Sequence, residues 1–166
     1  MHLYRTQNIY FDECFDNIKA KSVEHCLQQA SQYISEGNAS QAIATTKSQT
    51  IYDALLQEQE THGVSIVNNV LIGNANIDIL SSRKTIFMRL NNPVVVDLGQ
   101  GMQIINFVAL TAAPARLGAL NLRYLSRLTR LMNDKALIES LRAVEGVDGL
   151  KLMLNDVSPN DQVSAA

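Results

Sequence analysis

The segment of residues 55–77, LLQEQETHGVSIVNNVLIGNANI, contains the features that decide the fold. A short amphipathic stretch leads into a turn at Gly63, and an apolar run rich in β-branched residues follows as far as Gly73. This order predicts a helix, a turn and a strand, because β-branched residues at a short period are typical of strands. An apolar run that stops at Gly-Asn presents the next side chain, Asn74, at the edge of a sheet, where it can meet a partner or substrate.

Two helices are predicted before the end of this stretch. Ser22 is a candidate N-cap, and apolar residues then recur at helical spacing as far as Ile34, just before a Glu-Gly pair. A second amphipathic helix, with Ile51 and Leu55 on its inner face, is predicted to end before Gly63. The first 21 residues have mixed polarity and predict an irregular arm or a short strand.

Three apolar runs that follow predict further strands, at residues 85–90, 93–98 and 103–111. The last run is nearly continuous, which is typical of a central strand buried on both faces. Helices, then strands, then helices predict an α/β fold, a single domain in which a mixed β-sheet is flanked by helices. The domain is predicted to span residues 1–156, and residues 157–166 are predicted to form a polar tail.

After Pro114 the apolar period becomes helical again. The leucines of this helix are predicted to face inward: Leu117, Leu120, Leu122, Leu125, Leu128 and Leu131. Its arginines are predicted to face outward, where they keep the helix soluble or receive an acidic partner: Arg116, Arg123, Arg127 and Arg130. Asp134 is a candidate cap for a shorter helix ending at Leu141, and residues 150–154 predict a last helical turn.

Composition narrows the functional classes. The net charge of −2 argues against a nucleic-acid-binding protein, because neutralising phosphates requires a clustered basic excess. The two cysteines, Cys14 and Cys26, are too few for a secreted disulfide framework and have no metal-site spacing, so reduced thiols and no metal or other cofactor are expected. No apolar run approaches the roughly 20 residues that cross a bilayer, and we expect a cytoplasmic protein that does not insert into a membrane.

Two late motifs resemble a known family. The predicted buried strand ends in TAAPA at residues 111–115, and NLRYLSRLTRLM and DKALIESL follow at residues 121–132 and 134–141. These segments resemble the L-A-P-E-like turn, the H-L-x-L-L-A-R-L-S-R-L-L helix and the D-E-E-L-V-E-R-L segment of enzyme IIA domains. The family is the mannitol/fructose class of the bacterial phosphotransferase system, including its nitrogen-regulatory relatives, and the order of elements is similar over residues 9–154.

The same resemblance extends to the opening stretch but not to the family's reactive residues. Residues 54–74 can be laid without a gap against the family segment ALLEREKLGSTGIGNGVAIPH, which holds an arginine and the phosphorylated histidine. The arginine position is Glu58, the active histidine position is Asn74, and the second histidine position, on the later helix, is Asn121. The proline that usually precedes the active histidine is Gly73. The resemblance therefore implies the family fold with an altered site.

These replacements predict that phosphoryl transfer is lost. A carboxamide nitrogen is delocalised into its carbonyl and offers no nucleophilic lone pair, so Asn74 cannot carry phosphate as an imidazole does. A carboxylate from Glu58 repels the transferring group, whose charge requires cationic donors. Asn121 can still hydrogen-bond to Asn74 or to a backbone carbonyl and preserve the geometry of the pocket.

Simpler interpretations of these residues exist. Glu58 can be part of a solvated helix end, and Asn74 and Asn76 beside Gly73 are what an ordinary turn would use. His62 precedes a glycine, which is typical of a surface or turn residue, although it could also be a displaced phosphoryl acceptor.

The resemblance implies protein partners, and it leads first to a regulatory or interaction module without phosphoryl transfer. Its partners would be the histidine phosphocarrier protein, a sugar permease component or a regulator. The first alternative is an active phosphocarrier of sugar transport that uses His62. The second is a small-molecule sensor that uses the polar pocket around Asn74 and Asn121.

Overall fold

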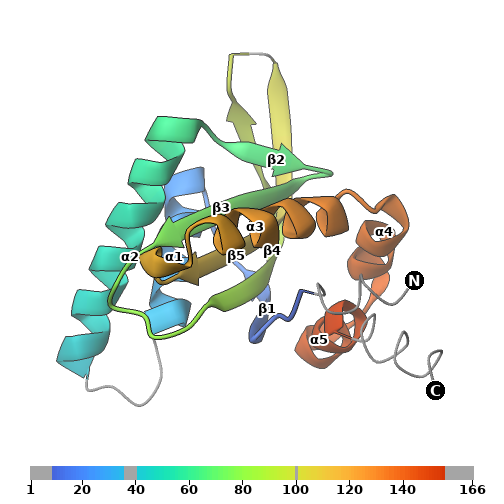
Figure 1. Ribbon diagram of the computed structural model, residues 1–166. Helices are drawn as coiled ribbons and strands as arrows, with labels where there is room; N and C mark the ends of the chain where they lie inside the picture. Colours follow the sequence, from blue (N-terminus) through green and yellow to red (C-terminus); the bar gives the residue numbers. More distant parts are fainter. Residues whose placement is uncertain (1–8, 36–40, 100, 156–166) are drawn as a thin grey trace, which may run out of the picture.

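The computed structural model describes residues 9–35, 41–99 and 101–155, with the side chains of residues 41–46 excepted. They form a five-stranded sheet with helices on both faces (Figure 1). The strands are β1 (Glu13–Ile18), β2 (Ser65–Val67), β3 (Val70–Asn76), β4 (Lys84–Asp97) and β5 (Met102–Ala113). The helices are α1 (Val23–Ser35), α2 (Gln41–His62), α3 (Ala119–Met132), α4 (Lys135–Ala143) and α5 (Gly146–Asn155), and a 3-10 turn spans Ala115–Leu117.

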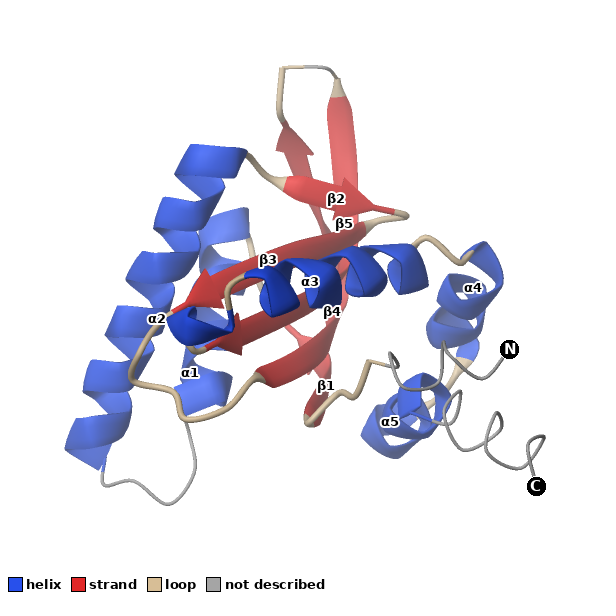
Figure 2. Ribbon diagram, in the orientation of Figure 1, coloured by secondary structure: helices blue, strands red, loops and turns tan. Residues whose placement is uncertain are grey.

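The sheet is mixed, with the strand order β1-β4-β5-β3-β2. The pairs β1 with β4 and β3 with β5 are parallel, whereas β4 with β5 and β2 with β3 are antiparallel (Figure 2). β5 is the central strand, and its residues are buried from Phe107 to Ala113. The predicted fold class and the predicted central strand are therefore confirmed.

Alternation along the strands separates two hydrophobic cores. On one face, Leu110 and its neighbours pack with α1 and α2. On the other face, Phe107 and Ala109 pack with α3, α4, α5 and the segment that leads into β1. Because successive side chains of β3 point to opposite faces, Gly73 faces Leu27 of α1, and Asn74 faces α3.

The predicted helix starts are confirmed where a cap was identified. The Ser22 hydroxyl accepts a hydrogen bond of 3.1 Å from the backbone N–H of His25, and α1 begins at the next residue, Val23. Asp134 caps α4 by accepting from the backbone N–H groups of Ala136 and Leu137. Both caps satisfy N–H groups that have no partner inside the helix.

The interpretation of Asn74 and Asn76 as turn residues is wrong, because β3 continues through both positions. Gly73 permits close packing: a Cβ atom there would lie 3.0 Å from Cδ1 of Leu110, so the leucine side chain would have to shift to admit it. The tight turn lies earlier, between β2 and β3, where Asn68 and Asn69 have φ angles of 50° and 67°. Two adjacent residues with positive φ fit a two-residue hairpin turn, and Asn tolerates this conformation.

The prediction that all the leucines of α3 face inward is also wrong. Leu120 and Leu122 are 59% and 67% exposed, while Leu128 is buried as predicted. The other buried positions of α3 are Asn121, Tyr124 and Met132. Residues three or four positions apart share a helix face, and here that face passes through Asn121, so the leucines on either side of it lie outside the core.

Element lengths differ from the predictions at two places. The expected strands 85–90 and 93–98 are one strand, β4, whose pairing with β5 shifts between Arg89 and Val94. α5 begins at Gly146 and includes Gly149, so it is longer than the predicted last turn. The predicted N-terminal strand exists as β1, whereas the predicted tail, residues 157–166, lies outside the described residues.

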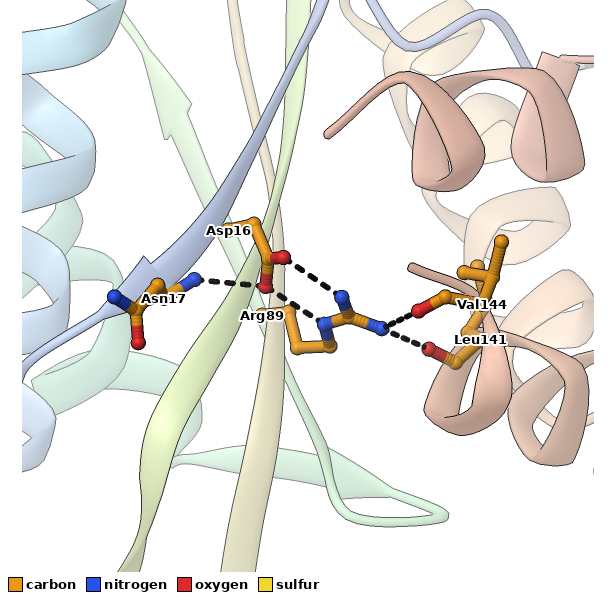
Figure 3. A network of polar contacts seen from close by, with 5 residues as sticks. All are labelled: Asp16, Asn17, Arg89, Leu141 and Val144. Carbon is orange, nitrogen blue, oxygen red and sulfur yellow. Dashed lines mark hydrogen bonds and ion pairs between the residues drawn. The ribbon is translucent and has the colours of Figure 1, made fainter. Parts of the chain in front are cut away.

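One arginine connects β1, near the start of the described chain, to the end of α4 (Figure 3). Arg89 on β4 donates from Nε and Nη2 to the two carboxylate oxygens of Asp16 on β1, each at 2.7 Å. Its Nη1 donates to the carbonyls of Leu141 and Val144, at 2.8 and 2.6 Å, where α4 ends. A single planar guanidinium thus pairs a carboxylate and satisfies two carbonyls that a helix end leaves free.

A second connection lies nearby. The side-chain oxygen of Asn155 accepts from the backbone N–H of Phe11 at 3.0 Å, and its amide donates to the Phe11 carbonyl at 3.1 Å. These two residues are 144 positions apart in the sequence. The segment before β1 and the end of α5 are therefore bound to one another.

The Arg89 contact predicts a defined acid sensitivity. Hydrogen bonds from Arg89 hold the pKa of Asp16 below its ordinary value of 3.8. A carboxyl whose pKa is lower in the folded state stabilises the fold above the ordinary pKa, and this contribution is lost as the pH falls through the folded-state pKa. Asp16→Asn should lower the free energy of unfolding by about 1–2 kcal/mol at neutral pH, and less as the pH falls below 3.8. Urea unfolding at neutral and acidic pH measures the difference, and a gap that stays constant between the two would contradict this prediction.

Candidate functional site

Three polar side chains form a row across adjacent strands beneath α3. Asn74 on β3 pairs in register with Thr111 on β5, and Thr111 pairs with Thr85 on β4. Both threonines are fully buried and Asn74 is half-buried. Buried polar groups require hydrogen-bond partners, so this row depends on the residues that α3 and the sheet place around it.

Asn121 of α3 binds the β3 end of the row. Its amide nitrogen donates to the side-chain oxygens of Asn76 and Asn74, at 2.7 and 3.2 Å. Its own oxygen accepts from Nε and Nη2 of Arg83, both at 3.4 Å. Asn121 is only 2% exposed, and these contacts explain how a carboxamide occupies a buried position of the helix.

Tyr124 of α3 binds the other end of the row. The hydroxyl groups of Tyr124 and Thr85 are hydrogen-bonded, Thr85 donates to the Thr111 hydroxyl at 3.3 Å, and Thr111 donates to the Lys84 carbonyl at 3.2 Å. Each hydroxyl has one proton to donate, so Tyr124 must be the donor to Thr85. Burial raises the pKa of Tyr124, which keeps the phenol protonated for this role. The chain of hydroxyls is therefore closed and contains no base.

Two guanidinium groups lie over the Tyr124 ring. The guanidinium carbon of Arg83 lies 4.0 Å from the ring centroid, and that of Arg127 lies 6.0 Å away. Partial burial lowers the pKa of Arg83, but a guanidinium keeps its charge at any physiological pH. This side of the site is consequently positive.

A cleft of about 200 Å³ opens on the other side of Asn74, between α2, β3 and α3. Glu58 and His62, one turn apart on α2, line it together with Asn74, Leu125 and other residues of these elements. β2 pairs only with residues 70–72 of β3, so the half of β3 that carries Asn74 continues beyond the end of β2. The predicted exposure of Asn74 at this margin of the sheet agrees with that arrangement.

His62 and Glu58 contact each other at the mouth of the cleft. Nδ1 of His62 lies 3.0 Å from a carboxylate oxygen of Glu58, and their side chains are 67% and 37% exposed. In a neutral imidazole that donates from Nδ1, the lone pair is on Nε2. Among the residues that line the cleft, His62 is thus the one imidazole, and it lies next to a carboxylate.

The residues predicted to form the site lie together. Glu58, His62 and Asn74 line one cleft, and Asn121 contacts Asn74 from α3. Sequence reasoning did not identify Arg83, Thr85 or Thr111. A signal for Thr111 was present, since it stands within the apolar run at the end of β5, whereas Thr85 follows Lys84 at the start of β4 and gives no such signal.

The described part of the chain offers no other reactive centre of the metal or thiolate kind. No group of three His, Cys, Asp or Glu side chains there could hold a metal ion. Cys14 and Cys26 are buried, unpaired thiols, and burial raises their pKa to about 12 and about 11, so they are not thiolate nucleophiles at neutral pH. Among the described helices, none combines the length and apolarity needed to span a bilayer.

Comparisons with known proteins agree with the fold. Residues 11–156 match the model of the family described as "Phosphoenolpyruvate-dependent sugar phosphotransferase system, EIIA 2". A nitrogen regulatory protein of Bradyrhizobium diazoefficiens is 25% identical over 126 residues, which are 76% of this chain and 78% of the relative.

Two solved structures are similar in fold. The nitrogen regulatory protein IIA-Ntr of Neisseria meningitidis has a TM-score of 0.72 at 17% identity, over 86% of this chain and 93% of that one. Enzyme IIA-Mtl of Escherichia coli, solved in complex with phosphorylated enzyme IIB-Mtl, has a TM-score of 0.65 at 15% identity, over 90% and 98% of the two chains.

Proposed function

This chain belongs to the EIIA 2 family of the phosphoenolpyruvate-dependent sugar phosphotransferase system, and we propose that it is a regulatory member that binds protein partners without carrying phosphate. The observation behind this proposal is the hydrogen-bonded pair of carboxamides, Asn74 and Asn121, at the positions where the resemblance places the family's two histidines. Neither amide nitrogen has a lone pair available for attack on phosphorus.

The polar atoms of Asn121 are already hydrogen-bonded within the site. The amide of Asn121 is shared between Asn74 and Asn76, and its oxygen accepts from Arg83. A transferring phosphoryl group needs donors that are free to bind its oxygens, and here the Asn121 amide and Nε and Nη2 of Arg83 already bind carboxamide oxygens. This hydrogen-bond network keeps the shape of the site, although none of its carboxamide or guanidinium groups gains or loses a proton near neutral pH.

Glu58 opposes transfer as well. It lines the cleft beside Asn74, at the position where the resemblance places an arginine. Two like charges about 4 Å apart repel by on the order of 4 kcal/mol at an effective dielectric constant near 20, and solvent lowers this value for a side chain that is 37% exposed. A carboxylate in this cleft therefore disfavours a phosphoryl group even where a nucleophile is available.

A regulatory role fits the relatives. Two of the similar proteins are named nitrogen regulatory proteins, and the Escherichia coli IIA structure contains a IIB partner. We propose partners of the same kinds for this chain: the histidine phosphocarrier protein, a sugar permease component or a regulator. The cleft and two exposed leucines of α3, Leu120 and Leu122, provide the polar and apolar surface that such docking requires.

A second candidate function is phosphoryl transfer through His62. The contact between its Nδ1 and Glu58 supports this alternative, because a carboxylate that accepts from one ring nitrogen orients the other as a nucleophile. The same carboxylate would repel the incoming group, and for that reason we place the regulatory proposal first.

The two candidates are separated by incubating the chain with phosphoenolpyruvate and the purified upstream relay, and by measuring the intact mass. An active enzyme IIA serves as the positive control. The regulatory proposal predicts no added phosphoryl group on this chain while the control is fully labelled. A stable gain that disappears in His62→Ala and persists in His25→Ala, a histidine of α1, would establish the alternative and overturn the proposal.

A further inference from the structure

The exposed side of α3 carries a group of arginines, of which Arg127 also approaches the site through the Tyr124 ring. Arg123, Arg127 and Arg130, with Ser126, surround a shallow depression of about 360 Å³, and we call these residues the arginine face. They are three or four positions apart, which places them on one side of the helix. At a rise of about 1.5 Å per residue, the row from Arg123 to Arg130 is roughly 10 Å long.

The positive charge of the arginine face is not neutralised by its surroundings. The sequence contains no acidic residue between Asp97 and Asp134, although the whole chain has a net charge of −2. Within the described residues, the salt bridges and hydrogen bonds do not include Arg123 or Arg130. Nε of Arg127 is buried and has no hydrogen-bond partner there. Arg123 and Arg130 are exposed cations, so the arginine face can attract an acidic ligand from solution.

The neighbours of the arginine face indicate what kind of ligand it binds. Leu120 precedes Arg123 by three residues and Arg127 by seven, so it lies on the same side of the helix, and it is 59% exposed. A free phosphate ion would occupy only part of a 10 Å row and would make no use of a leucine. A peptide with carboxylates and one apolar side chain matches both the length and the chemistry.

We infer that the arginine face binds an acidic segment of a protein partner, with carboxylates on Arg123, Arg127 and Arg130 and an apolar side chain against Leu120. Arginine favours this role because its planar group binds a carboxylate through two parallel hydrogen bonds. The arginine face lies apart from the cleft, to which α3 contributes Leu125 and Thr129. The inference therefore adds a partner class to the proposed docking function and does not depend on whether any histidine accepts phosphate.

The test uses the full chain and a fluorescent twelve-residue peptide that carries one leucine followed by four glutamates. Fluorescence anisotropy at low and physiological ionic strength measures binding. Replacing Arg123, Arg127 and Arg130 together by Gln should weaken binding by about tenfold or more, because three charge pairs are lost. The matched control replaces three exposed lysines elsewhere, Lys19, Lys21 and Lys135, by Gln and removes the same charge. It should bind within about twofold of the wild type.

Further arms distinguish the specific interaction from other kinds of attraction. Leu120→Ser should weaken peptide binding severalfold, and the peptide with four glutamines should not bind. Equal weakening by the lysine control would overturn the inference, because it would show a general charge effect. Inorganic phosphate that displaces the peptide at equal concentration, with no effect of Leu120→Ser, would reduce the arginine face to a simple anion site and would also overturn it. The arginine triple variant is also incubated with the relay. Labelling of the chain there would contradict the proposed function, whereas loss of the arginine effect on peptide binding would contradict only the present inference.

Discussion

The triple variant Glu58→Arg, Asn74→His, Asn121→His should accept a phosphoryl group from the charged phosphocarrier protein, in contrast to the parent chain. In this reaction the bond from phosphorus to the donor imidazole breaks as a bond to the imidazole introduced at position 74 forms. The double variant that retains Glu58 should react about 100-fold more slowly than the triple variant, because repulsion on the order of 2–3 kcal/mol remains at the cleft after solvent screening of this 37% exposed side chain. Radiolabel transfer over time measures both rates.

This prediction has two internal controls. Adding His62→Ala to the triple variant should leave its rate unchanged, which separates the introduced imidazole from the native one. Circular dichroism and urea unfolding should show that the variants remain folded, since Asn121 is buried and its replacement disturbs contacts to Asn76 and Arg83. A folded triple variant that stays unlabelled would show that the site differs from an active one by more than these three residues.

Arg89→Met should lower the free energy of unfolding by about 3 kcal/mol. The change leaves the Asp16 carboxylate and the carbonyls of Leu141 and Val144 without their donor. Breaking a buried ion pair from one side costs roughly 3–5 kcal/mol, and the lower value applies because Asp16 is 22% exposed. Urea unfolding at neutral pH measures the loss.

The appropriate controls retain size or charge. Arg89→Lys keeps the charge but loses the planar set of donors, and it should recover only part of the stability. Arg142→Met removes an arginine of similar length that binds side chains of Asn106 and Asn69 at exposed positions, and it should cost about 1 kcal/mol or less. Equal losses for Arg89→Met and Arg142→Met would contradict the role assigned to Arg89.

Sequence reasoning predicted the fold because strong local signals agreed with one another. The nearly continuous apolar run of β5, the caps at Ser22 and Asp134 and the late leucine-rich segment each indicate one element type. Where two signals conflicted, the prediction failed. Gly73 next to Asn74 has the composition of a turn, and only the packing of Leu110 against that position explains why glycine is in a strand.

The site was predictable in part. The resemblance identified Glu58, Asn74 and Asn121. In the structure Glu58 and Asn74 line one cleft, and Asn121 is hydrogen-bonded to Asn74. Arg83 could not be found, because it lies between predicted strands and contacts Asn121 only through the fold, 38 positions away. Side-chain networks of this kind depend on the register between strands, which a single sequence does not determine.

The bond between Phe11 and Asn155 has a consequence for how the chain is made. A ribosome releases the N-terminal segment long before Asn155 is synthesised, 144 residues later. Asp16 of β1 also pairs with Arg89 of β4. The Nη1 group of Arg89 gains its acceptors, the carbonyls at the end of α4, only after α4 has been synthesised. Among the described strands, β1 is therefore synthesised first but completes its contacts only when α4 and α5 follow, and until then its apolar side is open to chaperones or to other nascent chains.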